Sequence, residues 1–146
     1  MADIGAYNRE TMAPPADGSQ VLIVEDDAGL REVYADALRA EGFGVALASD
    51  GNQALALLAD RPRVPCAVLL DLRMPGMDGW ELARRLRDDT RWHLLPIVVV
   101  AAHYRVAEEA RRIGAAAWLQ KPVTLDRLIT AVRDVCEPIA SGASLQ

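Results

Sequence analysis

The chain has 146 residues, a formal net charge of −5 and 51% hydrophobic residues. This length favours one domain, and the composition is that of a globular protein that can bury a core. The negative charge, without any basic stripe, argues against nucleic-acid binding, which depends on neutralising phosphates. No run approaches the roughly 18 apolar residues of a membrane span, and the first residues lack the basic-then-apolar layout of a signal peptide. We therefore expect a cytoplasmic protein with no membrane partner.

Strands and helices are predicted to alternate along the chain. Residues 1–19, with two adjacent prolines and Gly18, are expected to form a flexible leader. The apolar pattern then predicts a strand at 20–25, a helix at 27–41, a strand at 44–49, a helix at 51–60, a strand at 66–71, a helix at 79–89, a strand at 96–101, a helix at 105–113, a strand at 116–120 and a helix at 125–136. Residues 139–146 are expected to be a short tail, so the folded unit is 20–138 and carries no output domain.

The apolar pattern also indicates how these elements pack. The strands are short runs rich in β-branched residues, as in residues 21–24, which is typical of strands buried on both faces of a parallel sheet. Two helices carry an apolar stripe, made of Leu30, Val33, Tyr34, Ala37 and Leu38 in the first and of Leu125, Leu128, Ile129, Val132 and Cys136 in the last. Five alternating pairs predict a flavodoxin-like (βα)5 α/β fold, a doubly wound parallel sheet with strand order 2-1-3-4-5.

Charged residues follow three of the predicted strands. Glu25 and Asp26 follow the first strand, Asp71 follows the third, and Lys121, the only lysine in the chain, follows the fifth. Ligands of open α/β sheets bind at the carboxyl ends of the strands, and the predicted order puts strands 1 and 3 side by side. We therefore expect these groups to share one crevice. Crowded carboxylates need a cation, and a ligand set of oxygens alone suits Mg²⁺.

Such a crevice can transfer a phosphoryl group. A carboxylate between a hard metal ion and an ammonium can attack phosphorus to form an aspartyl phosphate, while both cations neutralise the transferring oxygens. Asp71 is the expected nucleophile because it stands alone at its strand end. Glu25 and Asp26 are adjacent and better suited to holding the metal ion, directly or through water.

Four segments resemble, in order and spacing, the receiver domain of two-component response regulators. They read VLIVEDDAGLRE, VLLDLRMPGMDGWEL, PIVVVAA and WLQKP. The resemblance covers about residues 20–138 and implies that Asp71 accepts a phosphoryl group from a sensor histidine kinase or a histidine phosphotransfer protein. The receiver would then signal by docking on a downstream protein target or through a phosphorelay. It implies no enzyme beyond assistance to its own phosphorylation and dephosphorylation.

The same resemblance implies roles for individual residues. The Mg²⁺ ligands would be Glu25, Asp26, Asp71 and the backbone carbonyl of Arg73. Lys121 would bind the phosphoryl oxygens, and its peptide bond to Pro122 would be cis, as an X–Pro bond permits at roughly 0.5–1 kcal/mol. Separately from the resemblance, Arg105, Arg112 and Arg127, with nearby acidic residues, would allow a homodimer through the face of the fourth helix, fifth strand and fifth helix, although surface ion pairs are weak evidence.

One position departs from the family pattern. Ala101 stands where such receivers place a Thr or Ser, so the hydroxyl that would follow the phosphoryl group is missing. Trp118 occupies the place of the aromatic switch residue, but it also fits a partly buried surface aromatic. We expect phosphorylation of Asp71 to change the output face less than usual. The alternative is a pseudo-receiver, a binding module whose partner recognition ignores phosphate.

Two further alternatives are weaker. A phosphatase of the haloacid-dehalogenase kind also uses an aspartyl phosphate and Mg²⁺, but it needs a second Asp two residues after the nucleophile, where this chain has Arg73. The two cysteines, Cys66 and Cys136, lack the spacing of a metal site. We expect two reduced, mostly buried thiols rather than a disulfide.

Overall fold

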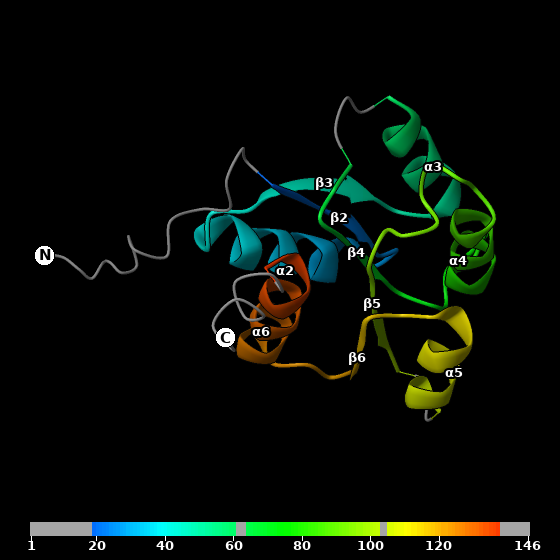
Figure 1. Ribbon diagram of the computed structural model, residues 1–146. Helices are drawn as coiled ribbons and strands as arrows, with labels where there is room; N and C mark the ends of the chain where they lie inside the picture. Colours follow the sequence, from blue (N-terminus) through cyan, green and yellow to red (C-terminus); the bar gives the residue numbers. More distant parts are fainter. Residues whose placement is uncertain (1–18, 61–63, 103–104, 138–146) are drawn as a thin grey trace, which may run out of the picture.

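Residues 19–60, 64–102 and 105–137 are described in a computed structural model of the protein (Figure 1). Within them, strands and helices alternate along the chain. The strands are β2 (Gln20–Val24), β3 (Gly44–Ala48), β4 (Ala67–Leu70), β5 (Ile97–Ala101) and β6 (Ala117–Gln120). The helices are α2 (Ala28–Ala40), α3 (Gly51–Ala59), α4 (Gly79–Arg87), α5 (Val106–Ile113) and α6 (Leu125–Cys136). Nearly all of the predicted leader and the whole predicted tail lie outside the described residues.

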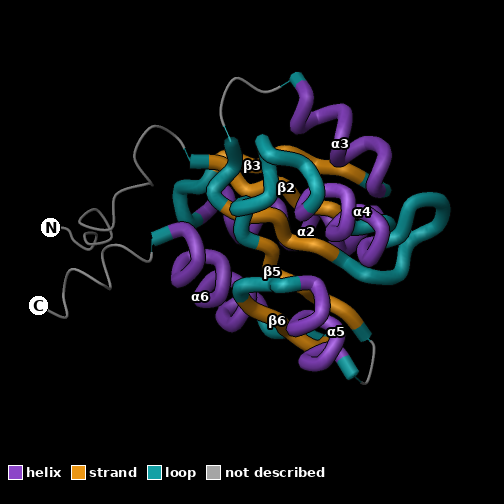
Figure 2. Tube along the Cα trace, turned by 45° about the vertical axis from the view of Figure 1, so that its right-hand side comes forward, coloured by secondary structure: helices purple, strands orange, loops and turns teal. Residues whose placement is uncertain are grey.

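The strands form one parallel sheet in the order β3-β2-β4-β5-β6. Counted along the chain this order is 2-1-3-4-5, so the predicted fold is confirmed. Helices α2 and α6 cover one face of the sheet, and α3, α4 and α5 cover the other (Figure 2). The register places Val24 beside both Ala48 and Leu70. The segments that follow β2 and β4 therefore leave the sheet at the same edge.

Alternate strand residues supply the two layers of the core. In β2, Leu22 and Val24 belong to the layer under α3 and α4, whereas Val21 and Ile23 belong to the layer under α2 and α6. All four side chains are at most 1% exposed, as expected for a strand covered on both faces. Full burial of such a side chain contributes about 1.5–3 kcal/mol. The sheet is thus a rigid support for the residues at its carboxyl edge.

Side-chain caps determine where several helices begin. Asp27, Asp50, Asp78 and Thr124 precede α2, α3, α4 and α6, and each accepts a hydrogen bond from the backbone N–H three residues later. Such a cap typically contributes about 1 kcal/mol. Asp27 directly follows the acidic residues after β2, so this cap also orients the segment that carries them.

The predicted apolar stripes are wrong at two positions. Val33 in α2 is 46% exposed and Leu125 in α6 is 39% exposed. Tyr34 and Leu38 are buried as predicted, and Ala35, which was not predicted, is fully buried. Helix α2 packs against both the sheet and α6. The positions of these two neighbours together determine which of its side chains are buried. A periodic pattern cannot specify the second neighbour.

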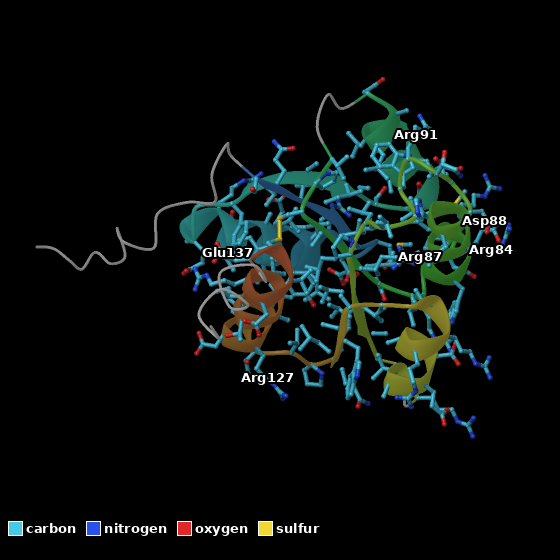
Figure 3. All side chains as sticks on the ribbon, viewed as in Figure 1. Arg84, Arg87, Asp88, Arg91, Arg127 and Glu137 are labelled. Atoms are coloured by element: carbon cyan, nitrogen blue, oxygen red, sulfur yellow. A yellow bond between two sulfur atoms is a disulfide. The ribbon has the colours of Figure 1, made fainter. Side chains whose placement is uncertain are left out.

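Cys66 and Cys136 form a disulfide, with Cα atoms 5.1 Å apart (Figure 3, yellow bond). The prediction of two reduced thiols is wrong in this structure. Cys66 directly precedes β4, and Cys136 is the last residue of α6, which runs back along the sheet to the edge where the strands begin. Their separation of 70 residues concealed this proximity. The cytoplasmic location stays a prediction.

The helices are short. Helix α2, the longest in the described part of the chain, has 13 residues, whereas a membrane-spanning helix needs about 20. Across residues 19–60, 64–102 and 105–137, no helix combines the length and the apolar composition of a bilayer-spanning segment.

Candidate functional site

Three acidic residues meet at the carboxyl edge of the sheet. Glu25 and Asp26 follow β2, Asp71 follows β4, and one carboxylate oxygen of each lies within 4.8 Å of the others. Backbone bonds continue the strand register: the N–H of Glu25 donates to the carbonyl of Ala48, and the N–H of Asp71 donates to that of Val24, both at 3.0 Å. Glu25 and Asp71 are 2% and 6% exposed, whereas Asp26 faces solvent. Two buried carboxylates therefore lie beside an exposed one.

Lys121, which follows the edge strand β6, completes this cluster. Its Nζ lies 3.0 Å from Oε1 of Glu25 and 3.5 Å from Oδ2 of Asp71. The residue follows β6, where its N–H donates to the carbonyl of Ala101 at 2.9 Å, and its peptide bond to Pro122 is cis. The structure thus brings together all the charged groups that the sequence predicted for one crevice.

The surroundings of Asp71 disfavour its ionised form. Burial, followed by the charge of the Glu25 carboxylate, raises the pKa of Asp71 from 3.8 to about 7, although the Lys121 ammonium and the hydrogen bond from the Arg73 N–H oppose the shift. Without further positive charge, the Asp71 carboxyl group is therefore partly protonated near neutral pH. A cation bound here would favour the carboxylate, which is the form that can act as a nucleophile or a metal ligand.

Lys121 stays positively charged in this setting. Burial acts to lower its pKa, but the hydrogen bond with Glu25 and the carboxylate of Asp71 together raise the pKa above its ordinary value. When all three carboxylates are ionised, the single ammonium leaves two negative charges uncompensated. Among the described residues, this cluster offers oxygen donors alone, which fits a hard divalent ion such as Mg²⁺.

Two residues that the sequence analysis missed hold the Glu25 segment in place. The guanidinium of Arg31 donates to the carbonyl of Glu25 at 2.8 Å and to that of Asp26 at 3.4 Å. The N–H of Asp27 donates to Oε2 of Glu25 at 3.1 Å. Both carboxylate oxygens of Glu25 thus accept a protein hydrogen bond. The signal available in the sequence was the position of Arg31, one turn into the helix that follows the acidic pair.

Tyr34 lies beneath the cluster. It is 3% exposed, on the face of α2 that packs on the sheet. Burial raises the pKa of its phenol, the Lys121 ammonium opposes this shift, and the carboxylates of Glu25 and Asp71 add to it. The hydroxyl is therefore within electrostatic range of the buried charges. The sequence analysis had assigned Tyr34 only to an apolar stripe.

The end of β5 carries no hydroxyl. Ala101 is 1% exposed and pairs with Gln120 of β6, so it lies inside the sheet beside the lysine segment. The next residue, Ala102, faces solvent. Trp118 pairs with Val99 in the register of β6 and is 46% exposed. The position of the expected hydroxyl is therefore filled by a methyl group.

Arg73 connects the site to α4. Its N–H donates to Oδ1 of Asp71 at 3.3 Å, and its guanidinium carbon lies 5.9 Å from the ring centroid of Trp80. Nε1 of Trp80 donates to Oε1 of Glu109 on α5 at 2.7 Å. The sequence analysis gave no role to Trp80 or Glu109, because 29 residues separate them.

Gly79, the first residue of α4, allows this helix to begin directly against the Asp71 segment. Its N–H donates to the carbonyl of Leu72 at 2.9 Å. A Cβ at Gly79 would overlap the carbonyl oxygen of Asp71 and lie 2.7 Å from Cα of Leu72. Since both contacts are with backbone, any side chain here would push α4 away from the site.

Comparison with known proteins agrees with this geometry. A family model described as the response regulator receiver domain matches residues 21–133. The response regulator MprA of Mycolicibacterium vanbaalenii is 41% identical over 120 residues, which are 78% of this chain and 48% of that protein. A putative response regulator NtrX-like of Rickettsia bellii is 33% identical over 121 residues, 80% of this chain and 24% of the relative. The chain thus spans about half, or less, of the length of these curated relatives.

Solved structures lead to the same family. The crystal structure of a sensor protein from Polaromonas sp. JS666 superposes with a TM-score of 0.75 at 32% identity, covering 83% of this chain and 98% of the other. The chemotaxis protein CheY4 of Vibrio cholerae superposes with a TM-score of 0.73 at 27% identity, covering 80% and 98%. The segment that the family model matches contains every element from β2 to α6 except Gln20, the first residue of β2, and the last three residues of α6. The chain therefore belongs to the family of response regulator receiver domains.

Proposed function

We propose that this chain is a Mg²⁺-dependent phosphoacceptor, in which Asp71 takes a phosphoryl group from the phosphohistidine of a sensor kinase or a histidine phosphotransfer protein. The observation that carries the proposal is the convergence of Asp71 with Glu25, Asp26 and the Lys121 ammonium at one edge of the sheet. Membership of the receiver family supports the same function.

The residues present fit a magnesium site. Asp26 and Asp71 offer carboxylate oxygens, and Glu25 lies close enough to act directly or through water. The resemblance to receiver domains adds the backbone carbonyl of Arg73 as an expected ligand. Because Glu25 already accepts bonds from Lys121 and from the N–H of Asp27, a water-bridged role suits it better. When bound, the ion would neutralise charge on the transferring phosphoryl group.

The chain's own residues would then act as follows. An ionised oxygen of Asp71 forms a bond to phosphorus while the P–N bond of the phosphohistidine donor breaks, and the imidazole leaves with the electron pair of that bond. Lys121, 3.5 Å from Asp71, stabilises the negative charge on the phosphoryl oxygens. The product is an aspartyl phosphate and a histidine in the donor.

Arg73 argues against a phosphatase. A haloacid-dehalogenase enzyme would use an Asp two residues after the nucleophile as acid and base, and the guanidinium of Arg73 cannot give up a proton in this way. The proposed role is therefore that of a phosphoacceptor whose modified form persists long enough to be read by a partner.

A pseudo-receiver is the second candidate, and Ala101 favours it. The phosphoryl group would find no hydroxyl at the end of β5, and allosteric couplings typically amount to about 1–3 kcal/mol. One lost charge-assisted hydrogen bond, worth about 1.5–3 kcal/mol, is comparable with the whole coupling. In this reading, partner binding would not depend on phosphate.

Incubation with acetyl phosphate and Mg²⁺, followed by intact-mass measurement, tests the proposal. A phosphoacceptor gains one phosphoryl group, and Asp71→Asn loses this gain. Absence of any adduct in the natural chain would support the pseudo-receiver, and rapid turnover of a phosphomonoester would support the phosphatase. Phosphotransfer profiling against the histidine kinases of the source cell would then identify the donor.

The output is also a proposal, because the matched relatives are longer than this chain. We expect the phosphorylated domain to act by docking on a protein target or by passing the phosphoryl group along a relay. A homodimer through α5, β6 and α6, and a location in the cytoplasm, remain predictions.

A further inference from the structure

We propose that Arg73, Trp80 and Glu109 transmit the phosphorylation state of Asp71 to α5. This inference rests on the proposed function and deepens it. The three side chains form one continuous path: the Arg73 guanidinium lies over the Trp80 ring, and the Trp80 indole donates to the Glu109 carboxylate at 2.7 Å. Arg73 contacts Asp71 through its backbone N–H, and Trp80 and Glu109 would act only as positioning residues.

The first step of the path is short and rigid. Arg73 lies two residues after Asp71, and its N–H donates to the Asp71 carboxylate at 3.3 Å. Gly79 packs the start of α4 against the backbone of Asp71 and Leu72, which places Trp80, the second helical residue, beside the same segment. A change in charge at Asp71 therefore changes the electrostatic potential at the Arg73 side chain.

Two arrangements of Arg73 compete. Without phosphate, its exposed guanidinium rests over the Trp80 ring. Phosphorylation replaces the single charge of the Asp71 carboxylate with a phosphoryl group that carries about two negative charges at neutral pH. A charge-assisted hydrogen bond between arginine and phosphate is stronger than a cation–π contact at an exposed site. Arg73 would then leave the ring for the phosphoryl oxygens.

The second step concerns the bond between Trp80 and Glu109. A cation above the indole face polarises the ring and strengthens donation from its N–H, because neighbouring polar contacts reinforce one another. Departure of Arg73 would weaken the bond that ties α5 to α4. Glu109 lies in the first turn of α5, whose N-cap residue, Arg105, makes no side-chain capping hydrogen bond, whereas Arg87 of α4 binds carbonyls at the other end of α5. In this proposal α4 stays in place, and Glu109 and the α5 helix move relative to it.

This route requires no hydroxyl at the end of β5. Ala101 cannot follow the phosphoryl group, and Trp118 pairs with Val99 two residues away from it along the sheet register. The path through Trp80 instead leaves the site on the α4 side. A receiver with Ala101 could thus still change the surface of α5.

The test uses ¹⁵N NMR of the full chain with Mg²⁺, before and after saturation with beryllofluoride, which stands in for the phosphoryl group on Asp71. In the natural chain we expect the Trp80 indole N–H resonance, assigned through Trp80→Phe, to move together with the amides of α5. In Arg73→Gln the indole resonance should no longer move. In Trp80→Phe, which keeps an aromatic ring but removes the donor, the α5 shifts should fall to less than half.

Arg85→Gln is the matched control. Arg85 is an exposed arginine of the same helix that bonds Glu81 and not the Trp80 ring, so its variant should respond as the natural chain does. Glu109→Ala, which removes the acceptor from a partly exposed position on α5, provides a second variant should Trp80→Phe fail to fold. Its α5 shifts should also fall to less than half.

The outcomes separate the two proposals. If acetyl phosphate gives no adduct and beryllofluoride moves no amide beside Asp71, the proposed function itself is wrong. If the adduct forms but the Trp80 indole stays still, or the α5 shifts persist in Trp80→Phe or Glu109→Ala, the path is overturned while the phosphoacceptor function stands.

Discussion

The ammonium of Lys121 lies 3.0 Å from Oε1 of Glu25, across 96 residues of sequence. Glu25 is 2% exposed, and its other carboxylate oxygen accepts the backbone N–H of Asp27. The Lys121 ammonium therefore has two roles. It compensates a buried carboxylate, and it presents a positive charge to whatever Asp71 receives.

Lys121→Met should weaken both roles. Leaving the Glu25 carboxylate without its ammonium should lower the free energy of unfolding at neutral pH by about 1–3 kcal/mol, measured by urea titration without Mg²⁺. Phosphorylation of Asp71 by acetyl phosphate should slow on the order of 10²-fold, as when a donor to a transition-state oxygen is removed. Lys121→Arg, which keeps the charge, should restore most of the stability. Unchanged stability in Lys121→Met would contradict the compensation.

The raised pKa of Asp71 makes stability depend on pH. Between the ordinary value of 3.8 and the folded value of about 7, the folded protein binds more protons than the unfolded chain. Its stability is therefore highest below about pH 4 with respect to this group and falls as pH rises towards 7, by at most about 4 kcal/mol.

Urea unfolding at several pH values, without metal, measures this loss. Asp71→Asn removes the titrating group and should flatten the profile over the same window. Addition of Mg²⁺ should also flatten it for the natural chain, because the ion favours the carboxylate. Equal slopes for Asp71→Asn and the natural chain would show that Asp71 is not the source.

Ala101→Thr should restore a hydroxyl at the end of β5. We expect beryllofluoride to shift the amides of β6, including that of Trp118, more in this variant than in the natural chain. The added hydrogen bond to the phosphoryl group would couple that strand to the site, with a typical value of about 1.5–3 kcal/mol. Ala101→Val, which has a similar shape without the hydroxyl, is the control. Large and equal shifts in both the natural chain and Ala101→Thr would refute the expectation that Ala101 limits the response.

The disulfide should stabilise the fold. In non-reducing intact-mass measurements the oxidised chain should be two hydrogens lighter than the reduced one. The double variant Cys66→Ala with Cys136→Ala should lose about 2–4 kcal/mol of unfolding free energy relative to the oxidised chain. Reduction of the natural chain should cause a comparable loss. The bridge is refuted if the natural chain, air-oxidised, shows two thiols that react with iodoacetamide in the unfolded state.

Arg87 should matter more than its exposed neighbours on α4. Its guanidinium donates to four backbone carbonyls, those of His93, Leu95, Ile113 and Gly114, at 2.9–3.3 Å. Burial lowers the pKa of Arg87, and removing the side chain would leave these carbonyls short of donors. Arg87→Met should lower the free energy of unfolding by about 1–3 kcal/mol.

The control for Arg87 is Arg84→Gln, on the same helix (Figure 3). Arg84 is exposed and pairs only across the surface, with Glu81 and Asp88, so its variant should change stability little. Thermal and urea unfolding compare the two variants. Equal losses for both would mean that the carbonyl contacts of Arg87 do not hold α4, α5 and the segment before β5 together.

The sequence by itself determined the sheet and the place of the site. Short β-branched runs alternating with amphipathic segments leave few topologies, because crossovers between parallel strands are right-handed. Once the strand order is known, the residues that follow β2, β4 and β6 share one edge. Glu25, Asp71 and Lys121 could be placed together in this way, since each position depends only on a local strand end.

Only the tertiary structure decided how side chains of remote helices meet. The pairing of Cys66 with Cys136 depends on how far α6 returns along the sheet, and the bond between Trp80 and Glu109 depends on how α4 and α5 lie side by side. The exposure of Val33 depends likewise on a second neighbour of α2. Hydrophobic periodicity reports which face of an element is apolar, but it carries no information on the distance between two elements that are not adjacent in the chain.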